Sequence, residues 1–278
     1  MDPLVSTAWL AEKLGAPDLR IADCSWFLPG EGRDGRFEYE VGHLPGAVFL
    51  DLAEIVDTAH PAPMMLPPAE KFASRMAKLG LGDGTRIVLY DGSPHHTAAR
   101  GWAMLRSFGV PDVAILDGGS AKWQAEGRPL ETGAATPRPR HATVRDRGVG
   151  IRDLAAMRAN LDSGAEQVVD ARSPSRFVGA EPEPRPGVVP GHIPGSVNLH
   201  YARFFHPDGT WKRGEELRAV FETGGIDLDR PIVATCGSGV TASVVAFAAH
   251  LLGREAAVYD GSWAEWGADP ATPKETGA

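Results

Sequence analysis

One cysteine, Cys236, stands in a sequence setting that could make its sulfur a nucleophile. It follows the apolar run PIVAT (231–235), and the loop CGSGVT (236–241) places Gly237 and Gly239 before a stretch typical of a helix. In a parallel α/β sheet this order puts the cysteine at the carboxyl end of a strand, the edge where ligands bind. Glycines let successive backbone N–H groups turn inward, and the following helix adds its positive end. We therefore expect a ring of amides that favours the reactive thiolate over the thiol.

Such a ring would also stabilise a bound anion or a persulfide, so Cys236 is a candidate for covalent catalysis. The alternative is a structural cysteine in an apolar core, which we accept for Cys24 because no glycine turn follows it. A cysteine phosphatase is a second alternative, and it needs an arginine where this sequence has Ala242. No Arg or Lys lies between Cys236 and Arg254, which argues against a dianionic phosphate ligand.

The bulk composition excludes several classes of function. The 278 residues carry a net charge of −8, whereas a protein whose main partner is nucleic acid needs a basic face. No apolar run approaches the roughly 20 residues of a membrane helix, and the N-terminus lacks the pattern of a signal peptide. We therefore expect a cytoplasmic protein without a membrane segment. Two cysteines and nine scattered histidines indicate neither a disulfide framework nor a metal site.

The chain is internally duplicated. The motif GHLPGAV at 42–48 recurs as GHIPGSV at 191–197, which is 149 residues later. Trp123, which ends the first copy, recurs as Trp266, which is 143 residues later. Because the offset changes so little, only small insertions separate the copies, and a period of this size predicts two similar domains.

We expect an N-terminal domain at 1–130, a linker rich in Pro, Gly, Thr and Arg at 131–148, and a C-terminal domain at 149–278. In each copy short β-type runs alternate with helical runs. This alternation predicts an α/β fold, with a mainly parallel central sheet flanked by helices in each domain.

Three segments of the second copy must position the cysteine. Gln167–Val169 and Ile232–Ala234 are typical of buried strands. Thr241–Leu252 predicts a helix that is apolar nearly all round and therefore packs deep against the sheet.

The duplication, the GHxPG motifs, the CGSGVT loop and the C-terminal DGSWAEW together resemble the rhodanese superfamily of sulfurtransferases, from about Leu4 to Trp266. Within that superfamily the loop is most similar to that of the 3-mercaptopyruvate sulfurtransferases, which reads CGSGVT, whereas thiosulfate-preferring relatives carry CRKGVT. The resemblance implies two tandem rhodanese-like domains, of which only the C-terminal one is catalytic. Asp91 stands where the first copy would need its cysteine, which fits that implication.

The same resemblance implies a donor-binding clamp. Arg176 and Arg185 lie nine residues apart in a Pro- and Gly-rich segment, at the positions of two arginines that hold the donor carboxylate in the family. A guanidinium suits this task because it forms two parallel hydrogen bonds to a carboxylate. The alternative is two solvated surface arginines beside Glu181 and Glu183.

The loop residues complete the predicted substrate site, namely Gly237, Ser238, Gly239, Val240 and Thr241. The glycine and serine after the cysteine are neutral where a thiosulfate enzyme has cations. Ser238 and Thr241 offer hydroxyl donors toward the site, although Thr241 could serve only as the N-cap of the following helix.

His43 and Asp34 form a further candidate pair. In the 3-mercaptopyruvate enzymes a His and an Asp of the N-terminal domain lie beside the cysteine and the loop serine, and these two residues match those positions. Such a pair could move a proton during sulfur transfer, with Ser238 as a third member. However, His192 occupies the equivalent GHIPG position, and this repetition favours a structural alternative in which each histidine bonds a backbone carbonyl.

The resemblance and the residues together favour a ping-pong sulfurtransferase. Cys236 would take sulfur from 3-mercaptopyruvate as a persulfide, pyruvate would leave, and a thiol, cyanide or a thioredoxin-like protein would accept the sulfur. No cofactor is needed, because the cysteine sulfur is the carrier. Two alternatives stay open, a thiosulfate:cyanide sulfurtransferase and a non-catalytic sulfur-carrier or binding module.

Overall fold

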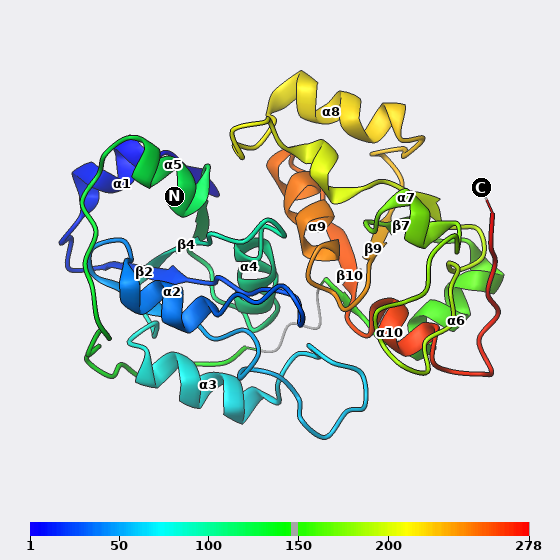
Figure 1. Cartoon of the computed structure of the whole chain (residues 1–278), viewed down its shortest axis with the longest axis horizontal. Coiled ribbons are helices and arrows are strands. Elements are labelled where there is room, and N and C mark those ends of the chain that lie inside the picture. The colour runs from blue at the N-terminus through cyan, green and yellow to red at the C-terminus, as the bar shows by residue number, and fades with distance from the viewer. Residues whose placement is uncertain (146–149, 278) are drawn as a thin grey trace. The chain divides into compact units, whose positions relative to one another are not determined.

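The computed structural model describes residues 1–145 and 150–277. The described residues form two compact units, each with its own sheet (Figure 1). Residues 146–149 and 278 lie outside the description, and they include the end of the predicted linker and the first residue of the predicted C-terminal domain. Within the linker, residues 132–145 contain no helix or strand and are mostly exposed.

The first unit has a five-stranded, fully parallel sheet in the order β1-β5-β4-β2-β3. Its strands are β1 (Leu4–Val5), β2 (Leu19–Asp23), β3 (Ala47–Phe49), β4 (Arg86–Tyr90) and β5 (Val113–Leu116). Its helices are α1 (Thr7–Lys13), α2 (Gly35–Val41), α3 (Ala69–Lys78), α4 (Ala98–Ser107) and α5 (Gly119–Ala125).

The second unit repeats this topology with the order β6-β10-β9-β7-β8, again fully parallel. Its strands are β6 (Ile151–Arg152), β7 (Gln167–Asp170), β8 (Val197–Asn198), β9 (Ile232–Thr235) and β10 (Ala256–Tyr259). Its helices are α6 (Leu154–Ser163), α7 (Pro174–Phe177), the 3₁₀ helix η1 (Tyr201–Phe204), α8 (Gly214–Thr223), α9 (Ala242–Leu251) and α10 (Ser262–Trp266). Strands and helices alternate in both units, so the predicted fold class of two tandem α/β domains is confirmed.

Each unit also contains a short segment from the other copy of the sequence. Residues 57–66 come from the first copy but belong to the second unit, where the Leu66 N–H donates to Asp260 Oδ2 at 2.7 Å. Residues 205–211 come from the second copy and belong to the first unit. A division of the sequence into two contiguous domains therefore does not describe this exchange of segments.

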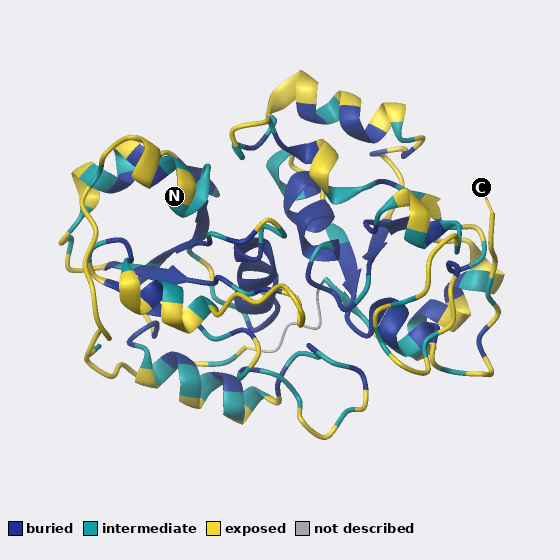
Figure 2. Ribbon diagram, viewed as in Figure 1, coloured by how far each residue is buried: buried dark blue, intermediate teal, exposed yellow. Residues whose placement is uncertain are grey.

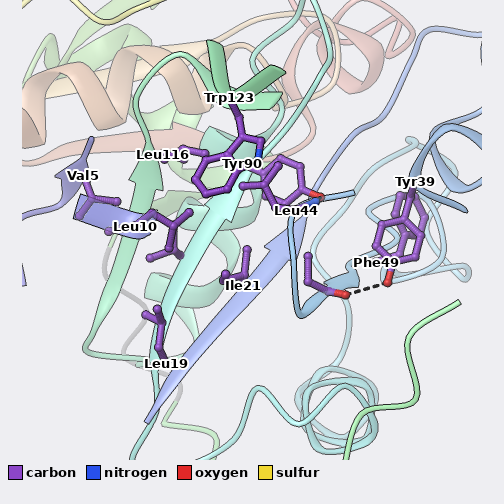
Figure 3. Packing of buried hydrophobic residues seen from close by; sticks show 13 residues of the cluster. Val5, Leu10, Leu19, Ile21, Tyr39, Leu44, Phe49, Tyr90, Leu116 and Trp123 are labelled. Carbon is purple, nitrogen blue, oxygen red and sulfur yellow. Dashed lines mark hydrogen bonds between the residues drawn. The ribbon is translucent and has the colours of Figure 1, made fainter. Parts of the chain in front are cut away.

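Tryptophan and leucine side chains anchor the cores. In the first unit Leu10 and Trp123 belong to one buried cluster on the sheet (Figure 3), and both are 0% exposed. The indole N–H of Trp123 donates to the carbonyl of Pro129, and that of Trp266 in the second unit donates to the carbonyl of Pro273, each at 2.8 Å. The last tryptophan of each copy therefore buries a large apolar area with its one polar group paired.

The elements that flank Cys236 match the sequence prediction closely. Strands β7 and β9 each extend one residue beyond the predicted ends. Helix α9 is one residue shorter at each end than the predicted Thr241–Leu252, because those two residues occupy its cap positions. Figure 2 shows α9 buried along most of its length, as its apolar sequence requires.

Candidate active site

Cys236 lies directly after β9, in the turn that leads into α9. It is a free cysteine and is 2% exposed. Gly239 has a φ of +78°, a conformation that favours glycine and lets the turn close within a few residues. The strand, loop and helix therefore place the sulfur at the carboxyl edge of the sheet, as predicted from the sequence.

Two of the loop amides bind a side chain that the sequence prediction overlooked. The N–H groups of Cys236 and Gly239 both donate to Ser262 Oγ, at 3.2 and 3.0 Å, and this hydroxyl donates to the carbonyl of Tyr259 at 2.8 Å. These two amides therefore do not belong to the expected ring around the sulfur, because a buried hydroxyl at the next strand–helix junction accepts their hydrogen bonds. The signal was present in the sequence motif DGSWAEW, which had contributed only to the resemblance to the rhodanese superfamily.

The equivalent loop of the first unit shows what the remaining amides can do. Asp91 stands at the position of the cysteine, and its carboxylate accepts hydrogen bonds from the N–H groups of Ser93 at 2.9 Å and Ala98 at 2.8 Å. Burial raises the pKa of Asp91 to about 7, and the two backbone hydrogen bonds oppose that rise. This loop therefore holds an acidic group with two converging amides.

The corresponding amides of the second unit are those of Ser238 and of Ala242, since Ala98 and Ala242 both begin the helix after the loop. Within the described parts of the chain, neither of these two amides has a hydrogen-bond partner. By this correspondence they are the donors available to a negatively charged sulfur on Cys236.

The other predicted loop residues lie around the cysteine. Ser238 and Val240 are buried, at 6% and 3% exposure. Thr241 occupies the N-cap position of α9, but its side chain makes no capping hydrogen bond. Its hydroxyl is therefore not used in the way that the capping alternative requires.

A buried ion-pair network stands beside the loop. Arg172, which follows β7, donates to both carboxylate oxygens of Asp170 at 2.6 to 3.0 Å and to Glu183 Oε1 at 2.8 Å. Its guanidinium lies 4.7 Å from the ring centre of Trp263. Side-chain exposure is 1% for Arg172, 0% for Asp170 and 3% for Glu183, so the three charges are fixed in the protein interior.

The network extends to both arginines of the predicted donor clamp. Arg176 donates to Glu183 Oε1 at 3.3 Å and pairs with its Oε2, and a side chain placed on Gly237 would meet Arg176 Nη2 at 3.2 Å. Burial lowers the pKa of Arg185, as does the positive charge of Arg176, while the negative charges of Cys236 and Glu183 act in the opposite direction. The structure thus brings Arg176, Arg185 and the cysteine loop together in one unit.

The sequence prediction missed the central roles of Arg172 and Glu183. Glu183 was noted only as a neighbour that would keep the two arginines solvated, and instead it is buried between Arg172 and Arg176. Arg172 carried one usable signal, since it comes two residues after the end of a buried strand at the same sheet edge as Cys236.

His43 and Asp34 lie in the first unit. The Nδ1 of His43 lies 2.8 Å from the carbonyl of Tyr39, and its ring stacks on Tyr39 at 4.1 Å. Asp34 is exposed and caps α2 by accepting the N–H of Phe37 at 3.0 Å.

The repeated histidine of the second unit has the same environment as His43. The Nδ1 of His192 lies 2.8 Å from the carbonyl of Phe177, and its ring stacks on Phe177 at 3.9 Å. The two histidines therefore make the same backbone contact in both copies, as the structural alternative requires. The proton-transfer role of His43 and Asp34 stays a prediction.

Two further features are absent from the described residues, 1–145 and 150–277. Among them no three His, Cys, Asp or Glu side chains gather into a group that could hold a metal ion. None of their helices is both long enough and apolar enough to cross a bilayer.

Comparison with known proteins gives consistent matches over nearly the whole chain. The model of the rhodanese-like domain matches twice, at residues 6–126 and 153–269. The chain is 44% identical over 270 residues to 3-mercaptopyruvate sulfurtransferase of Homo sapiens, covering 95% of this chain and 91% of that protein. It is 43% identical over 273 residues to thiosulfate sulfurtransferase of Cricetulus griseus, with the same coverage. Among solved structures, SseA of Escherichia coli, described with the 3-mercaptopyruvate sulfotransferases, matches with a TM-score of 0.87 and 36% identity, covering 95% of this chain and 99% of that one.

Proposed function

The chain belongs to the family of proteins built from rhodanese-like domains, and on this premise we propose that it moves sulfur from 3-mercaptopyruvate to a thiol through a persulfide on Cys236. One observation carries the proposal. A single unit holds a buried cysteine after a parallel strand, two unpartnered amides of the described chain beside it, and the paired arginines Arg176 and Arg185. That combination suits a substrate with one sulfur and one carboxylate.

The first half-reaction transfers the donor sulfur to the enzyme. The thiolate of Cys236 attacks the sulfur of mercaptopyruvate, so that an S–S bond forms and the donor C–S bond breaks. The electron pair of the broken bond leaves with pyruvate as its enolate, which then takes up a proton. Once the S–H proton of the donor has passed to the enolate or to solvent, the outer sulfur on Cys236 carries negative charge, which the amides of Ser238 and Ala242 would stabilise.

The second half-reaction regenerates the enzyme. A thiolate acceptor attacks the outer sulfur, the S–S bond breaks, and Cys236 returns as a thiolate. We propose a small thiol, cyanide or a reduced thioredoxin-like protein as the acceptor, because each offers a nucleophile that can reach an outer sulfur. The cysteine itself carries the sulfur through both halves, so no additional carrier enters the cycle.

The charge of the site favours mercaptopyruvate over thiosulfate. Three guanidiniums, of Arg172, Arg176 and Arg185, face two carboxylates, of Asp170 and Glu183, which leaves one positive charge. A Cys236 thiolate balances that charge. The site then has no net charge. A monoanionic donor therefore adds one uncompensated negative charge to it, whereas a dianion such as thiosulfate adds two.

The test is a comparison of initial rates with the two donors and a reducing thiol. We expect sulfide and pyruvate from mercaptopyruvate, a lower kcat/KM for thiosulfate, and no turnover by Cys236→Ser with its fold unchanged. A strong preference for thiosulfate would support the alternative donor. Mass spectrometry after incubation with either donor separates the third alternative, since a binding module would gain no sulfur on Cys236.

A further inference from the structure

We propose that Glu183 determines the donor specificity of this site by cancelling one positive charge of the arginine cluster, so that dianionic donors are disfavoured. The inference rests on the proposed sulfurtransferase function and concerns the same site. One of the two predicted clamp arginines, Arg176, is already paired with a buried carboxylate, that of Glu183.

The position of Glu183 is fixed from one side. Its Oε1 accepts from Arg172 Nη1 at 2.8 Å, and Arg172 in turn is held by Asp170 and by the carbonyl of Gly191 at 2.8 Å. The guanidinium of Arg172 also packs on the ring of Trp263. These partners hold Arg172 in place, so it cannot follow Glu183. A displacement of Glu183 would therefore leave a buried cation partly unpaired.

From the other side, Glu183 meets the cation that faces the cysteine loop. Its Oε2 pairs with Arg176 Nη2, the same guanidinium group that lies against Gly237. A carboxylate that binds to Arg176 must therefore share this guanidinium with Glu183. The positive charge of Arg176 is largely compensated before any donor arrives.

Arg185 is different. It makes no ion pair with an acidic side chain among the residues that the structure describes, and it is half buried, which lowers its pKa together with the charge of Arg176. Arg185 is thus the guanidinium of the cluster that has no carboxylate in direct contact among the described residues, although the charges of Glu183 and Cys236 act on it from a distance. One guanidinium can pair with one carboxylate, which matches a donor with a single negative charge.

A neutral residue at position 183 would leave a second uncompensated cation, on Arg176. The added charge attracts a dianion about twice as strongly as a monoanion, and in a partly buried site such an interaction is screened little by salt. The ratio of kcat/KM for thiosulfate to kcat/KM for mercaptopyruvate should therefore rise by about tenfold or more.

The experiment measures that ratio for the full-length wild type and for Glu183→Gln, Glu183→Asp and Glu181→Gln. Glu181 is the matched control, because it is exposed, lies two residues away and bonds only serine hydroxyls among the described residues. We expect the rise in Glu183→Gln alone, with the ratio staying within about threefold of the wild type in Glu183→Asp, which keeps the charge, and in Glu181→Gln. Thermal unfolding checks that each variant is folded, and Glu183→Ser, which leaves room for water on the guanidiniums, replaces Glu183→Gln if that protein does not fold.

Two results would overturn the proposal. Equal losses for both donors in Glu183→Gln would mean that Glu183 only maintains the structure. An equal shift in Glu181→Gln would mean that general surface charge, and not this pairing, sets the ratio. Absence of sulfur transfer from either donor in the wild type is a separate outcome, and it would reject the proposed function itself.

Discussion

Replacing Ser262 by alanine and by glycine tests how the active loop is shaped. Both changes remove a fully buried hydroxyl that accepts from the amides of Cys236 and Gly239 and donates to the carbonyl of Tyr259. Each buried polar group left without its partner costs about 1–3 kcal/mol. Three groups lose their partner here, namely the two amides and the carbonyl, but small shifts of the loop let them recover part of that cost. We therefore expect the free energy of unfolding of Ser262→Ala to fall by about 2–4 kcal/mol.

The glycine variant isolates the backbone contribution, because Ser262 has a φ of +50°. A side chain in this left-handed region costs about 1–2 kcal/mol, which glycine avoids, while the greater freedom of glycine in the unfolded chain offsets about half of that gain. Ser262→Gly should therefore be more stable than Ser262→Ala by about 0.5–1 kcal/mol. The two variants should nevertheless lose sulfur transfer to a similar extent, by about tenfold or more, since both lack the hydroxyl that orients the loop.

The assay combines urea unfolding with the rate of persulfide formation on Cys236, followed by mass spectrometry after mixing with mercaptopyruvate. Equal stability of the two variants would refute the backbone argument. Wild-type rates in both variants would refute the claim that the hydroxyl shapes the loop. A recovery of rate in Ser262→Gly alone would mean that backbone strain, and not hydrogen bonding, sets the loop geometry.

Three further predictions follow from close contacts and burial. Gly237→Ala should raise the KM for mercaptopyruvate several-fold in steady-state assays while unfolding changes by less than about 1 kcal/mol, because the new methyl group would meet Arg176 Nη2 at 3.2 Å and displace it. Gly119→Ala should destabilise the chain by at least about 2 kcal/mol in urea unfolding, because the residue has a φ of +56° and its Cβ would lie 2.4 Å from the carbonyl oxygen of Asp91. Asp91 has a pKa of about 7 against an ordinary 3.8, so its contribution to stability is fully present below pH 3.8 and is lost as pH rises to 7. Asp91→Asn should therefore gain about 2 kcal/mol relative to the wild type between pH 5 and 7.5, and an equal pH dependence of the two proteins would contradict the assignment.

The sequence was sufficient to predict the architecture because its main signals are local or repeated. Strand β9 and helix α9 are apolar runs bounded by turn residues, and their ends were correct to within one residue. The duplication then extended the same fold to the other copy. The exchange of residues 57–66 and 205–211 between units could not be predicted, because neither segment forms regular secondary structure and only their packing assigns them.

The predicted site was incomplete for a related reason. Spacing along the chain indicated Cys236 and its glycines, since a strand–turn–helix unit is local. Ser262 lies 26 residues further on, and only the parallel pairing of β9 with β10 brings it under the loop. Arg172 and Glu183 were missed because charged residues are usually solvated, and only the folded chain shows that these are nearly fully buried.

The two loops of this chain also support the proposal that only the second copy carries sulfur. In the first unit Asp91 supplies its own carboxylate to the converging amides, so the position is permanently filled. In the second unit Cys236 leaves the corresponding amides to a sulfur that can gain and lose a second atom. Changing Asp91 to cysteine would not be sufficient to convert the first unit. Gly119 stands there in place of Ser262, so the hydroxyl contacts of that loop differ: Ser25 Oγ accepts from the amide of Gly92 at 2.9 Å, and no hydroxyl stands at the position of Ser262. Ser25 also stands where the second unit has Arg172, the arginine that pairs with the buried carboxylate of Asp170. A reactive sulfur in this fold therefore requires the loop, the orienting hydroxyl and the guanidinium network together, and a variant with the cysteine alone should form no persulfide at position 91.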